Sequence, residues 1–422
     1  MRGALFVAQR LFFRRRREQR QGHPLLGASL GIALSLIPLV TVDHVADGMI
    51  DGIIGRNRET FTFHFQVHSW GYPERDEWDE SARLIRGSGE VLSSWVERRG
   101  FGLARFEEGR EGLTLRAVPF NLPQLSEKFA NYIEFDSGEW HLDSPDSILL
   151  GRDAAKRLNA HLGDEIRVLT ARKLIDGRFV PRVTRFVVRG VFTSGYQDLD
   201  RTWAFIPLDR GWTILSPESS QTFIGGLFSN LSVGMKESKN SVISSVPPSW
   251  FVYDWRELNF SILRNLESTR AILLFIMTLI ILVAVFNVTT SLIMLTIERR
   301  REIGILKCTG SSPRDITSTF LLAGMLASVV GTLTGLGGGL LVSRFVNEII
   351  RGIEFVLGFL PGMGADPKLL DEAHYLQYIP IVFRWKFTAL IGIATFLLSL
   401  LASTYPASRA GRLKPLSVLR QH

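Results

Sequence analysis

Four apolar stretches without a charged residue constrain this 422-residue chain more than any other feature. They cover residues 24–42, 271–297, 316–343 and 387–408. A helix needs roughly 20 apolar residues to cross the hydrocarbon core of a bilayer, and all four stretches reach or approach that length. The remaining residues hold every charge, at the density of an ordinary soluble protein. The sequence therefore predicts an α-helical membrane protein with four transmembrane helices and a large water-facing part. It excludes a simple soluble enzyme, a fibrous chain and a disordered chain.

The first apolar stretch follows a cluster of arginines, as the core of a secretory signal peptide does. It is longer than the usual signal core, and no convincing small-residue cleavage site follows it. We therefore predict a retained transmembrane helix that continues outward as a stalk. Asp43, Asp47 and Asp51 share one face of this stalk, with His44 adjacent. That pattern fits a solvated helix face better than a weak cation site.

Basic residues are distributed unevenly among the segments that connect the helices. Residues 1–23, 298–315 and 409–422 share one side of a four-helix topology, and they hold sixteen basic residues against four acidic ones. The positive-inside rule assigns that side to the cytoplasm, so both termini are expected there. The rest of the chain is net acidic, so the net charge of +8 reflects topology and nucleic-acid binding is the poorer explanation.

The resulting layout is lopsided, with one very large exported segment. The predicted segments are a basic cytoplasmic N-terminal segment (1–23), helix 1 (24–46), an exported α+β domain with stalks (47–265), helix 2 (266–297), a cytoplasmic loop (298–315), helix 3 (316–345), a short exported loop (346–385), helix 4 (386–408) and a cytoplasmic tail (409–422).

The exported domain alternates short strand-like and helix-like segments without a repeat, which predicts an α+β fold in two lobes. Residues 61–67 alternate apolar and polar side chains, so we expect a strand with His64 and His68 on its polar face. Residues 81–99 predict a helix, although two glycines interrupt it. No catalytic constellation is apparent in this domain, which argues against an enzyme.

A basic hairpin is predicted in the middle of the exported domain. Asp176-Gly177 is a strong two-residue turn signal at the tip of two long strand-like arms. Arg172, Lys173 and Arg178 surround this turn. The hairpin is either a solvated tip or a protruding basic arm that docks an acidic partner.

The membrane helices contain features of packing rather than of ion transport. Gly331, Gly335 and Gly339 are spaced by four, so a neighbouring helix can approach closely along that face. The four apolar stretches contain no carboxylate or lysine, which argues against an ion-coupled carrier. Cys308 is the only cysteine, so neither an intrachain disulfide nor a cysteine metal cluster can form.

The segment between helices 2 and 3 predicts a short amphipathic helix at the membrane surface. Its charges come first, apolar residues follow, and the chain then turns at Gly310 and Pro313 before it re-enters the membrane. A plain interfacial loop is the alternative.

This segment, ERRREIGILKCTGSSPRDI at residues 298–316, resembles the coupling-helix motif of FtsX-like, MacB-type (type VII) ABC permeases. The end of the chain, YPASRAGRLKPLSVLR at 405–420, is similar to the closing motif of the same superfamily. Several further stretches resemble the lipoprotein-releasing permeases of LolC/LolE type. They are LGRDAAKRLNAHLGD at 150–164, FTSGYQDLDRTWAFIP at 192–207, DWRELN at 254–259, TLIILVAVFNVTTSLIML at 278–295 and YLQYIP at 375–380. Residues 69–135 match nothing in that family.

The resemblance implies a permease subunit, with an FtsX-like permease domain at 266–422, that contains no nucleotide site of its own. ATP and Mg would bind to a separate ABC ATPase dimer, and the chain lacks a phosphate-binding loop of its own. A second permease, either another copy or a sister chain, would complete the pair. The residues that would transmit ATPase closure are Arg301, Glu302, Ile303, Ile305, Leu306 and Lys307.

The resemblance also implies a substrate, a carrier and a location. A lipoprotein would be extracted from the inner membrane of a diderm bacterium, with its acyl chains between helices 1 and 2 of the two permeases, and passed to a periplasmic carrier. The basic hairpin lies where one family member carries its carrier-binding hook. The runner-up is a mechanotransmission permease that activates a cell-wall hydrolase or drives efflux. The candidate acyl-contacting residues are Ile32, Leu36, Leu39, Phe275, Leu279, Leu282 and Phe286.

Overall fold

The computed structural model describes residues 24–173, 177–230, 235–358 and 381–413. The chain divides into two compact units. The membrane unit contains the described residues up to Ile50 and from Leu266 onward, and the α/β unit contains those from Asp51 to Asn265. The predicted N-terminal segment 1–23 lies outside the described residues, as does most of the predicted loop 346–385.

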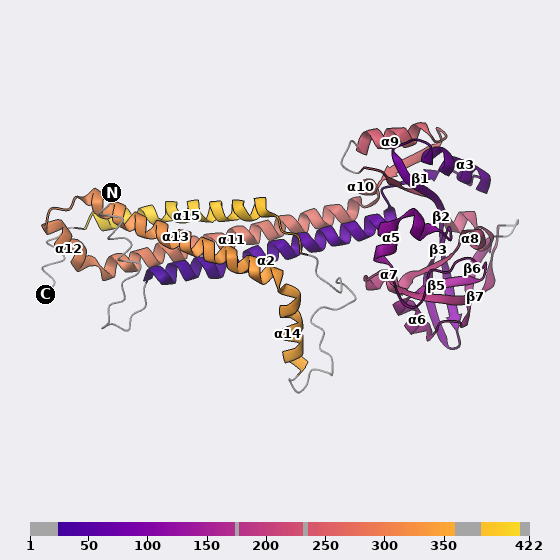
Figure 1. Cartoon of the computed structure of the whole chain (residues 1–422), viewed down its shortest axis with the longest axis horizontal. Coiled ribbons are helices and arrows are strands. Elements are labelled where there is room, and N and C mark those ends of the chain that lie inside the picture. Colours follow the sequence, from indigo (N-terminus) through magenta and orange to yellow (C-terminus); the bar gives the residue numbers. More distant parts are fainter. Residues whose placement is uncertain (1–23, 174–176, 231–234, 359–380, 414–422) are drawn as a thin grey trace. The chain divides into compact units, whose positions relative to one another are not determined.

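The membrane unit is built around four helices that are long and apolar enough to cross a membrane (Figure 1). They are α2 (Pro24–Asn57), α11 (Phe260–Glu298), α13 (Pro313–Arg344) and α15 (Trp385–Gly411). Each contains one of the four charge-free stretches, so the prediction of four apolar helices is confirmed. Two shorter helices, α12 (Arg300–Cys308) and α14 (Val346–Gly358), accompany them.

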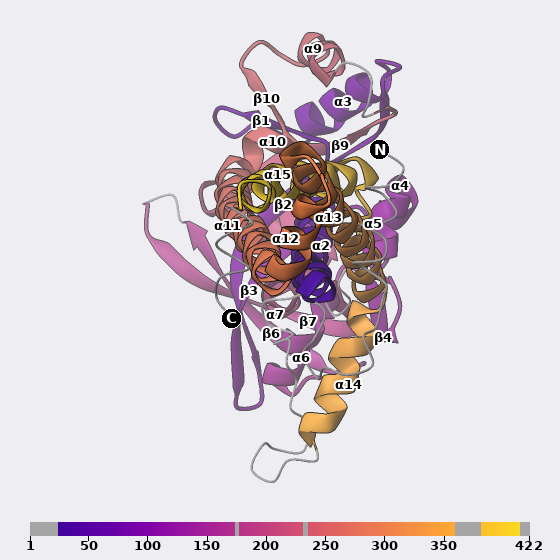
Figure 2. The same cartoon turned by 90° about the vertical axis from the view of Figure 1, so that its left-hand side faces the viewer.

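Helix α13 packs closely against α2 through its glycines. A Cβ atom added to Gly331 would lie 2.8 Å from the Cβ of Ile32, and one added to Gly335 would lie 2.7 Å from the Cβ of Leu36. No side chain larger than hydrogen fits at these distances, so the predicted close helix approach is present. Figure 2 shows the helices of this unit end-on.

The α/β unit is organised by one ten-stranded sheet, with the order β10-β1-β9-β2-β3-β8-β5-β7-β4, while β6 pairs with both β2 and β7. Its strands are β1 (Phe65–Ser69), β2 (Val91–Phe106), β3 (Gly109–Val118), β4 (Glu134–Gly138), β5 (Ser147–Gly151), β6 (Glu165–Lys173), β7 (Phe179–Thr193), β8 (Trp203–Pro207), β9 (Ser220–Phe228) and β10 (Trp250–Asp254). Because β6 pairs with both β2 and β7, the strands β2, β3, β8, β5, β7 and β6 close into a ring. The first half of β2 instead joins β9, β1 and β10 in an extension of the sheet.

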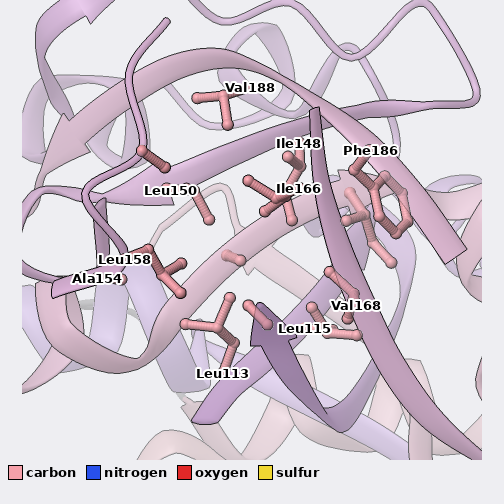
Figure 3. Packing of buried hydrophobic residues seen from close by; sticks show 14 of the residues in the cluster. Leu113, Leu115, Ile148, Leu150, Ala154, Leu158, Ile166, Val168, Phe186 and Val188 are labelled. Carbon is pink, nitrogen blue, oxygen red and sulfur yellow. The ribbon is translucent and has the colours of Figure 1, made fainter. Parts of the chain in front are cut away.

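The closed ring is filled by apolar side chains from alternate positions of its strands, as expected for a small barrel. Figure 3 shows Leu113, Leu115, Ile148, Ile166 and Phe186 pointing into this core, and all are fully buried. The remaining helical elements of this unit precede, connect or follow the strands in the chain. They are the π-helix η1 (Arg58–Thr62), α3 (Arg75–Arg86), α4 (Leu122–Leu125), α5 (Glu127–Tyr132), α6 (Arg152–Leu158), α7 (Gln197–Thr202), α8 (Leu208–Ile214), η2 (Pro217–Ser219), α9 (Met235–Ser244) and α10 (Trp255–Leu258).

Two sequence-based assignments in this unit are wrong. The helix predicted over 81–99 stops at Arg86, and Gly89, with a φ of +75°, turns the chain into the long strand β2. The strand predicted over 61–67 begins only at Phe65, because α2 ends in the π-helix η1. His64 is therefore not on a solvated strand face: it is 4% exposed, and its Nδ1 accepts a hydrogen bond from the Phe228 N–H.

Candidate functional site

Helix α12 forms the predicted amphipathic helix between the second and third membrane helices. Two residues of this helix are buried in the membrane unit. Ile303 is 2% exposed and belongs to the apolar core, and Gly304 is the other buried residue. Arg301, Glu302 and the apolar Ile305 and Leu306 are exposed. The outer surface of the helix therefore combines charged and apolar side chains, and Arg300 and Cys308 are exposed there as well.

Lys307 attaches α12 to the end of α15. Its Nζ donates hydrogen bonds to the carbonyl oxygens of Gly411 at 2.6 Å and Leu413 at 2.7 Å. These carbonyls lie where a helix leaves acceptors without backbone partners, so a lysine ammonium satisfies them well. Of the six residues expected to transmit ATPase closure, Ile303 and Lys307 thus face their own chain, while the other four face outward.

A cavity of about 990 Å³ lies beside α12. Its walls come from α12, the first turns of α13 and the end of α15, including Leu306, Phe320 and Arg412. A capping box at Ser312 and Asp315 begins α13 at this point, with the Ser312 Oγ accepting from the Asp315 N–H at 3.2 Å. The groove is mostly apolar with charged edges, which suits an inserted side chain of a partner protein.

The candidate acyl-contacting residues separate into two groups. On α2, Ile32, Leu36 and Leu39 are at most 1% exposed because this face packs on the glycines of α13. In this chain they are therefore packing residues. The four residues on α11 are at least 46% exposed: Phe275, Leu279, Leu282 and Phe286. A second exposed apolar face on α2 consists of Leu26, Leu30 and Leu34.

A buried polar cluster joins α2 to its neighbours. The Nε2 of His44 lies 3.0 Å from the Thr388 Oγ1 of α15, and its Nδ1 lies 3.3 Å from the Ser343 Oγ of α13. Asp47 Oδ2 accepts from Arg384 Nη1 at 2.5 Å and lies 3.5 Å from Arg270 Nη2. Asp43 and Asp47 are both 6% exposed, so the expectation of a solvated helix face is wrong for them.

The two arms of the predicted basic hairpin pair with each other. Strands β6 and β7 pair in register from Glu165↔Val187 to Lys173↔Phe179, and Gly177 has a φ of +83°. Arg172 is exposed, whereas the Lys173 Nζ donates to Glu218 Oε1 at 3.3 Å. Asp176, at the predicted tip, lies outside the described residues.

A buried ion network, which sequence reasoning did not identify, holds the end of the α2 stalk. Glu97 is fully buried and accepts hydrogen bonds from Arg99 Nε and Arg116 Nε, both at 2.6 Å. The two arginines also donate to the carbonyl oxygens of Phe61 and Thr60 in the π-helix η1, at 2.7 and 2.8 Å. The only signal in the sequence was the charged run at residues 97–99 inside an otherwise strand-like segment.

Electrostatics explains why this network stays charged. Burial acts to raise the pKa of the Glu97 carboxyl, but the Arg116 and Arg99 guanidiniums hold it below its ordinary value. Burial lowers the pKa of Arg99 to about 10, so the guanidinium remains protonated at neutral pH. Among the described residues, no group of three or more histidine, cysteine, aspartate or glutamate side chains could hold a metal ion.

Residues 274–415 match the FtsX-like permease C-terminal family, and this match contains α12, its groove and the hydrogen bonds of Lys307. This stretch of the chain is therefore similar to an FtsX-like permease C-terminal domain. The cavity beside α12 and the exposed apolar face of α11 both lie within the matched stretch.

The similarity extends well beyond the FtsX-like permease domain. The chain is 25% identical to the lipoprotein-releasing system transmembrane protein LolC of Xylella fastidiosa, covering 94% of this chain and 93% of that protein. It is 27% identical to the transmembrane protein LolE of Haemophilus influenzae, covering 69% of this chain and 68% of that one. The resemblance to lipoprotein-releasing permeases is confirmed. Among solved structures, the periplasmic region of MacB from Actinobacillus actinomycetemcomitans matches with a TM-score of 0.33 and 12% identity, covering 50% of this chain and 97% of that one.

Proposed function

We propose that this chain is the permease subunit of an ATP-driven ABC transporter that releases lipoproteins from the inner membrane toward a periplasmic carrier. The observation that carries the proposal is the similarity to LolC along 94% of the chain, with an FtsX-like permease domain at 274–415. The four apolar helices and the large α/β unit suit a protein that works in the membrane and in the periplasm. The relatives' names also make a transport subunit a better proposal than an enzyme.

We assign ATPase coupling to the outer surface of α12. Arg301, Glu302, Ile305 and Leu306 are available to a partner, and the neighbouring groove can receive a partner side chain. Ile303 and Lys307 have a different role in this proposal, because they fix α12 to the bundle and to α15. A push on α12 would then reach α15 through the hydrogen bonds of Lys307. ATP and Mg bind to the ATPase dimer, and both termini lie in the cytoplasm beside it.

The lipoprotein's acyl chains are proposed to contact the exposed apolar faces of α11 and α2. Burial of an acyl chain contributes about 0.8 kcal/mol per CH₂, so extraction requires an apolar surface that replaces the lipid. Phe275, Leu279, Leu282 and Phe286 supply such a surface on α11. On α2 the corresponding residues are Leu26, Leu30 and Leu34, which replace the buried Ile32, Leu36 and Leu39. A second permease, whether a copy or a sister chain, would complete the site.

Recovery of partners from the native membrane tests this function. The tagged full chain is solubilised, captured and analysed by mass spectrometry for everything retained with it. We expect an ABC ATPase together with acylated lipoproteins. An ATPase recovered with a cell-wall hydrolase or a tunnel protein, and without lipoprotein, would favour the mechanotransmission alternative. Capture without any ATPase would contradict both functions.

Variants of α12 make the same experiment specific for the coupling surface. Ile305→Asp and Leu306→Asp place charges on exposed apolar positions, so they should reduce the recovered ATPase at least tenfold without unfolding the bundle. Ile305→Leu keeps the surface apolar and should recover the ATPase normally. Equal recovery with all three variants would remove α12 from the ATPase interface.

A further inference from the structure

A cavity of about 260 Å³ lies in the α/β unit, apart from the basic hairpin and from every residue assigned above. It sits on the sheet face that is covered by α3 and α8, whose positions Figure 1 labels. Its walls include Trp78 of α3, Trp212 of α8 and Tyr72 of the loop after β1. Arg98 of β2 and Ser220 of β9 also line this cavity. Three of these residues fall within 69–135, a stretch that contains none of the family motifs quoted above.

Arg98 is the unusual member of this wall. The side chain is 1% exposed, its Nε donates to the Ser220 Oγ at 2.9 Å, and its guanidinium carbon lies 4.5 Å from the ring centroid of Trp212. Its Nη2 has no hydrogen-bond partner among the described residues. No carboxylate of those residues lies within ion-pair distance of it, and Glu218, whose charge acts on it, is exposed and pairs with Lys173.

The neighbouring arginines of the same sheet show that this fold can neutralise a buried guanidinium. Arg99 and Arg116 both bind the buried Glu97, on the opposite face of β2. A buried guanidinium without a counter-charge is costly, so proteins rarely keep one in the absence of an anion. Arg98 therefore differs from its neighbours, because the described part of the chain offers it no carboxylate within ion-pair distance.

A second donor without a partner belongs to the same cavity wall. The Nε1 of Trp212 has no acceptor among the described residues. An indole N–H and a guanidinium both donate only, so the group that satisfies them must be an acceptor. A carboxylate accepts from both and forms a charge-assisted bond with the guanidinium. The surrounding rings of Tyr72, Trp78 and Trp212 favour an apolar body and disfavour a strongly hydrated dianion such as inorganic phosphate.

We propose that this cavity binds a carboxylate carried on a flat apolar body, with Arg98 and Trp212 holding the carboxylate and the aromatic rings holding the body. Such a group can be a free aromatic acid or the carboxyl-terminal residue of a polypeptide. The chemistry at Arg98 is the same for both. This site is independent of lipoprotein release and of ATPase coupling.

Calorimetric titration of the full chain in lipid nanodiscs tests the site, with N-acetyl-phenylalanine as the probe. We expect saturable binding of the acid and at least tenfold weaker binding of N-acetyl-phenylalanine amide, which has the same body without the charge. Arg98→Gln should lower the affinity for the acid at least tenfold, and Trp212→Phe and Tyr72→Ala several-fold. Arg105→Gln, at an exposed position of the same strand, is the matched control and should bind normally.

Thermal unfolding of each variant separates a lost site from a lost fold. Tyr72 is 64% exposed, so Tyr72→Ala remains informative even if Arg98→Gln does not fold. Absence of saturable binding would overturn the proposal, as would equal affinities for acid and amide or equal affinities in the Arg98 and Arg105 variants. Tighter binding of phenyl phosphate would overturn the assignment of a carboxylate.

A peptide distinguishes the two sources of the carboxylate. Binding of acetyl-Ala-Ala-Phe with a free carboxyl terminus, as tight as that of the free acid, would identify a polypeptide terminus as the ligand. Binding more than tenfold weaker would identify a free small acid. Both results support the site and differ only in what fills it.

Discussion

Glu97 lies between two buried arginines where the α2 stalk enters the α/β unit. The three side chains satisfy each other, and the arginines use their remaining donors on the carbonyls of Thr60 and Phe61. A π-helix such as η1 leaves carbonyls without regular helical partners, so these hydrogen bonds stabilise an otherwise weak end of the stalk. At this scale, one carboxylate holds together strands β2 and β3 and the last turn of the stalk.

Glu97→Gln should destabilise the α/β unit strongly. It leaves Arg99 and Arg116 buried without a counter-charge, and breaking a buried pair in this way costs about 3–5 kcal/mol. Thermal or denaturant unfolding of the full chain in nanodiscs, followed by tryptophan fluorescence, measures the loss. Glu165→Gln is the control, because its ion pair with Arg185 is exposed and contributes at most about 1 kcal/mol. Equal losses in the two variants would contradict this account of the network.

His68 makes the stability of the α/β unit depend on pH. Burial, together with the charge of Arg99, lowers the pKa of His68 to about 4. The unfolded chain, with a histidine pKa near 6.5, then binds more protons than the folded chain in this range. The contribution of His68 to the free energy of unfolding is therefore fully present above pH 6.5. As the pH falls toward 4, the free energy of unfolding decreases by about 2–3 kcal/mol.

The variant His68→Gln should flatten this pH dependence between pH 6.5 and 4. The measurement is the free energy of unfolding of the full chain at several pH values. His161→Gln, at a site with a 78% exposed side chain, should leave the profile unchanged. The loss of Glu97 charge acts in a separate window, below its ordinary pKa of 4.5, because its pKa is depressed in the folded chain. An unaltered profile in His68→Gln would assign the pH dependence to other groups.

At the scale of elements, the contact between α13 and α2 is the clearest agreement between sequence and structure. Three glycines spaced four residues apart predicted a bare helix face, and the structure has α2 packed against it. The amphipathic helix α12 and the hairpin of β6 and β7 were likewise predicted from local signals: a charge-then-apolar order and an Asp-Gly turn. The segment 81–99 was mispredicted because its first residues do form a helix, α3, and its remainder pairs with β9.

Gly335→Ala should destabilise the membrane unit, whereas Gly337→Ala should not. The added Cβ at Gly335 would lie 2.7 Å from the Cβ of Leu36 and 3.0 Å from the Cα of Ala33, whereas nothing lies within 4 Å of one at Gly337. Overpacking of this kind costs about 1–3 kcal/mol. Thermal aggregation of the purified variants in detergent compares the two directly. Equal midpoint temperatures of aggregation for the two variants would show that α13 and α2 can separate without a loss of stability.

At the scale of the whole molecule, function depends on surfaces that the chain leaves free for partners. In the proposed function these are the outer face of α12 and the exposed apolar faces of α11 and α2, and carrier docking would add the basic arm around Arg172. Each belongs to an element whose other side is firmly packed or paired. A surface of this kind can transmit or receive force without being deformed itself.

Reversal of charge on the hairpin tests carrier docking. Arg172→Glu and Arg178→Glu should reduce binding of the carrier recovered with the complex at least tenfold, because an acidic partner would then be repelled. Arg185→Glu, farther along β7 and exposed, is the matched control and should bind normally. Surface plasmon resonance at low and physiological salt makes the comparison. Normal binding by both hairpin variants would contradict a role for the arm.

The sequence by itself determined the membrane helices, the amphipathic helix α12 and the pairing of β6 with β7, because each depends on short-range patterns of apolarity, charge or turn residues. Only the tertiary structure decided which polar side chains are buried. Asp47, Glu97 and Arg98 look like surface residues in the sequence, yet all three are inside the protein. Their hydrogen-bond partners include residues of other strands and helices: Arg384 for Asp47, Arg116 for Glu97 and Ser220 for Arg98. The same holds for the faces of α2, because only packing against α13 separates Ile32 from the exposed Leu30.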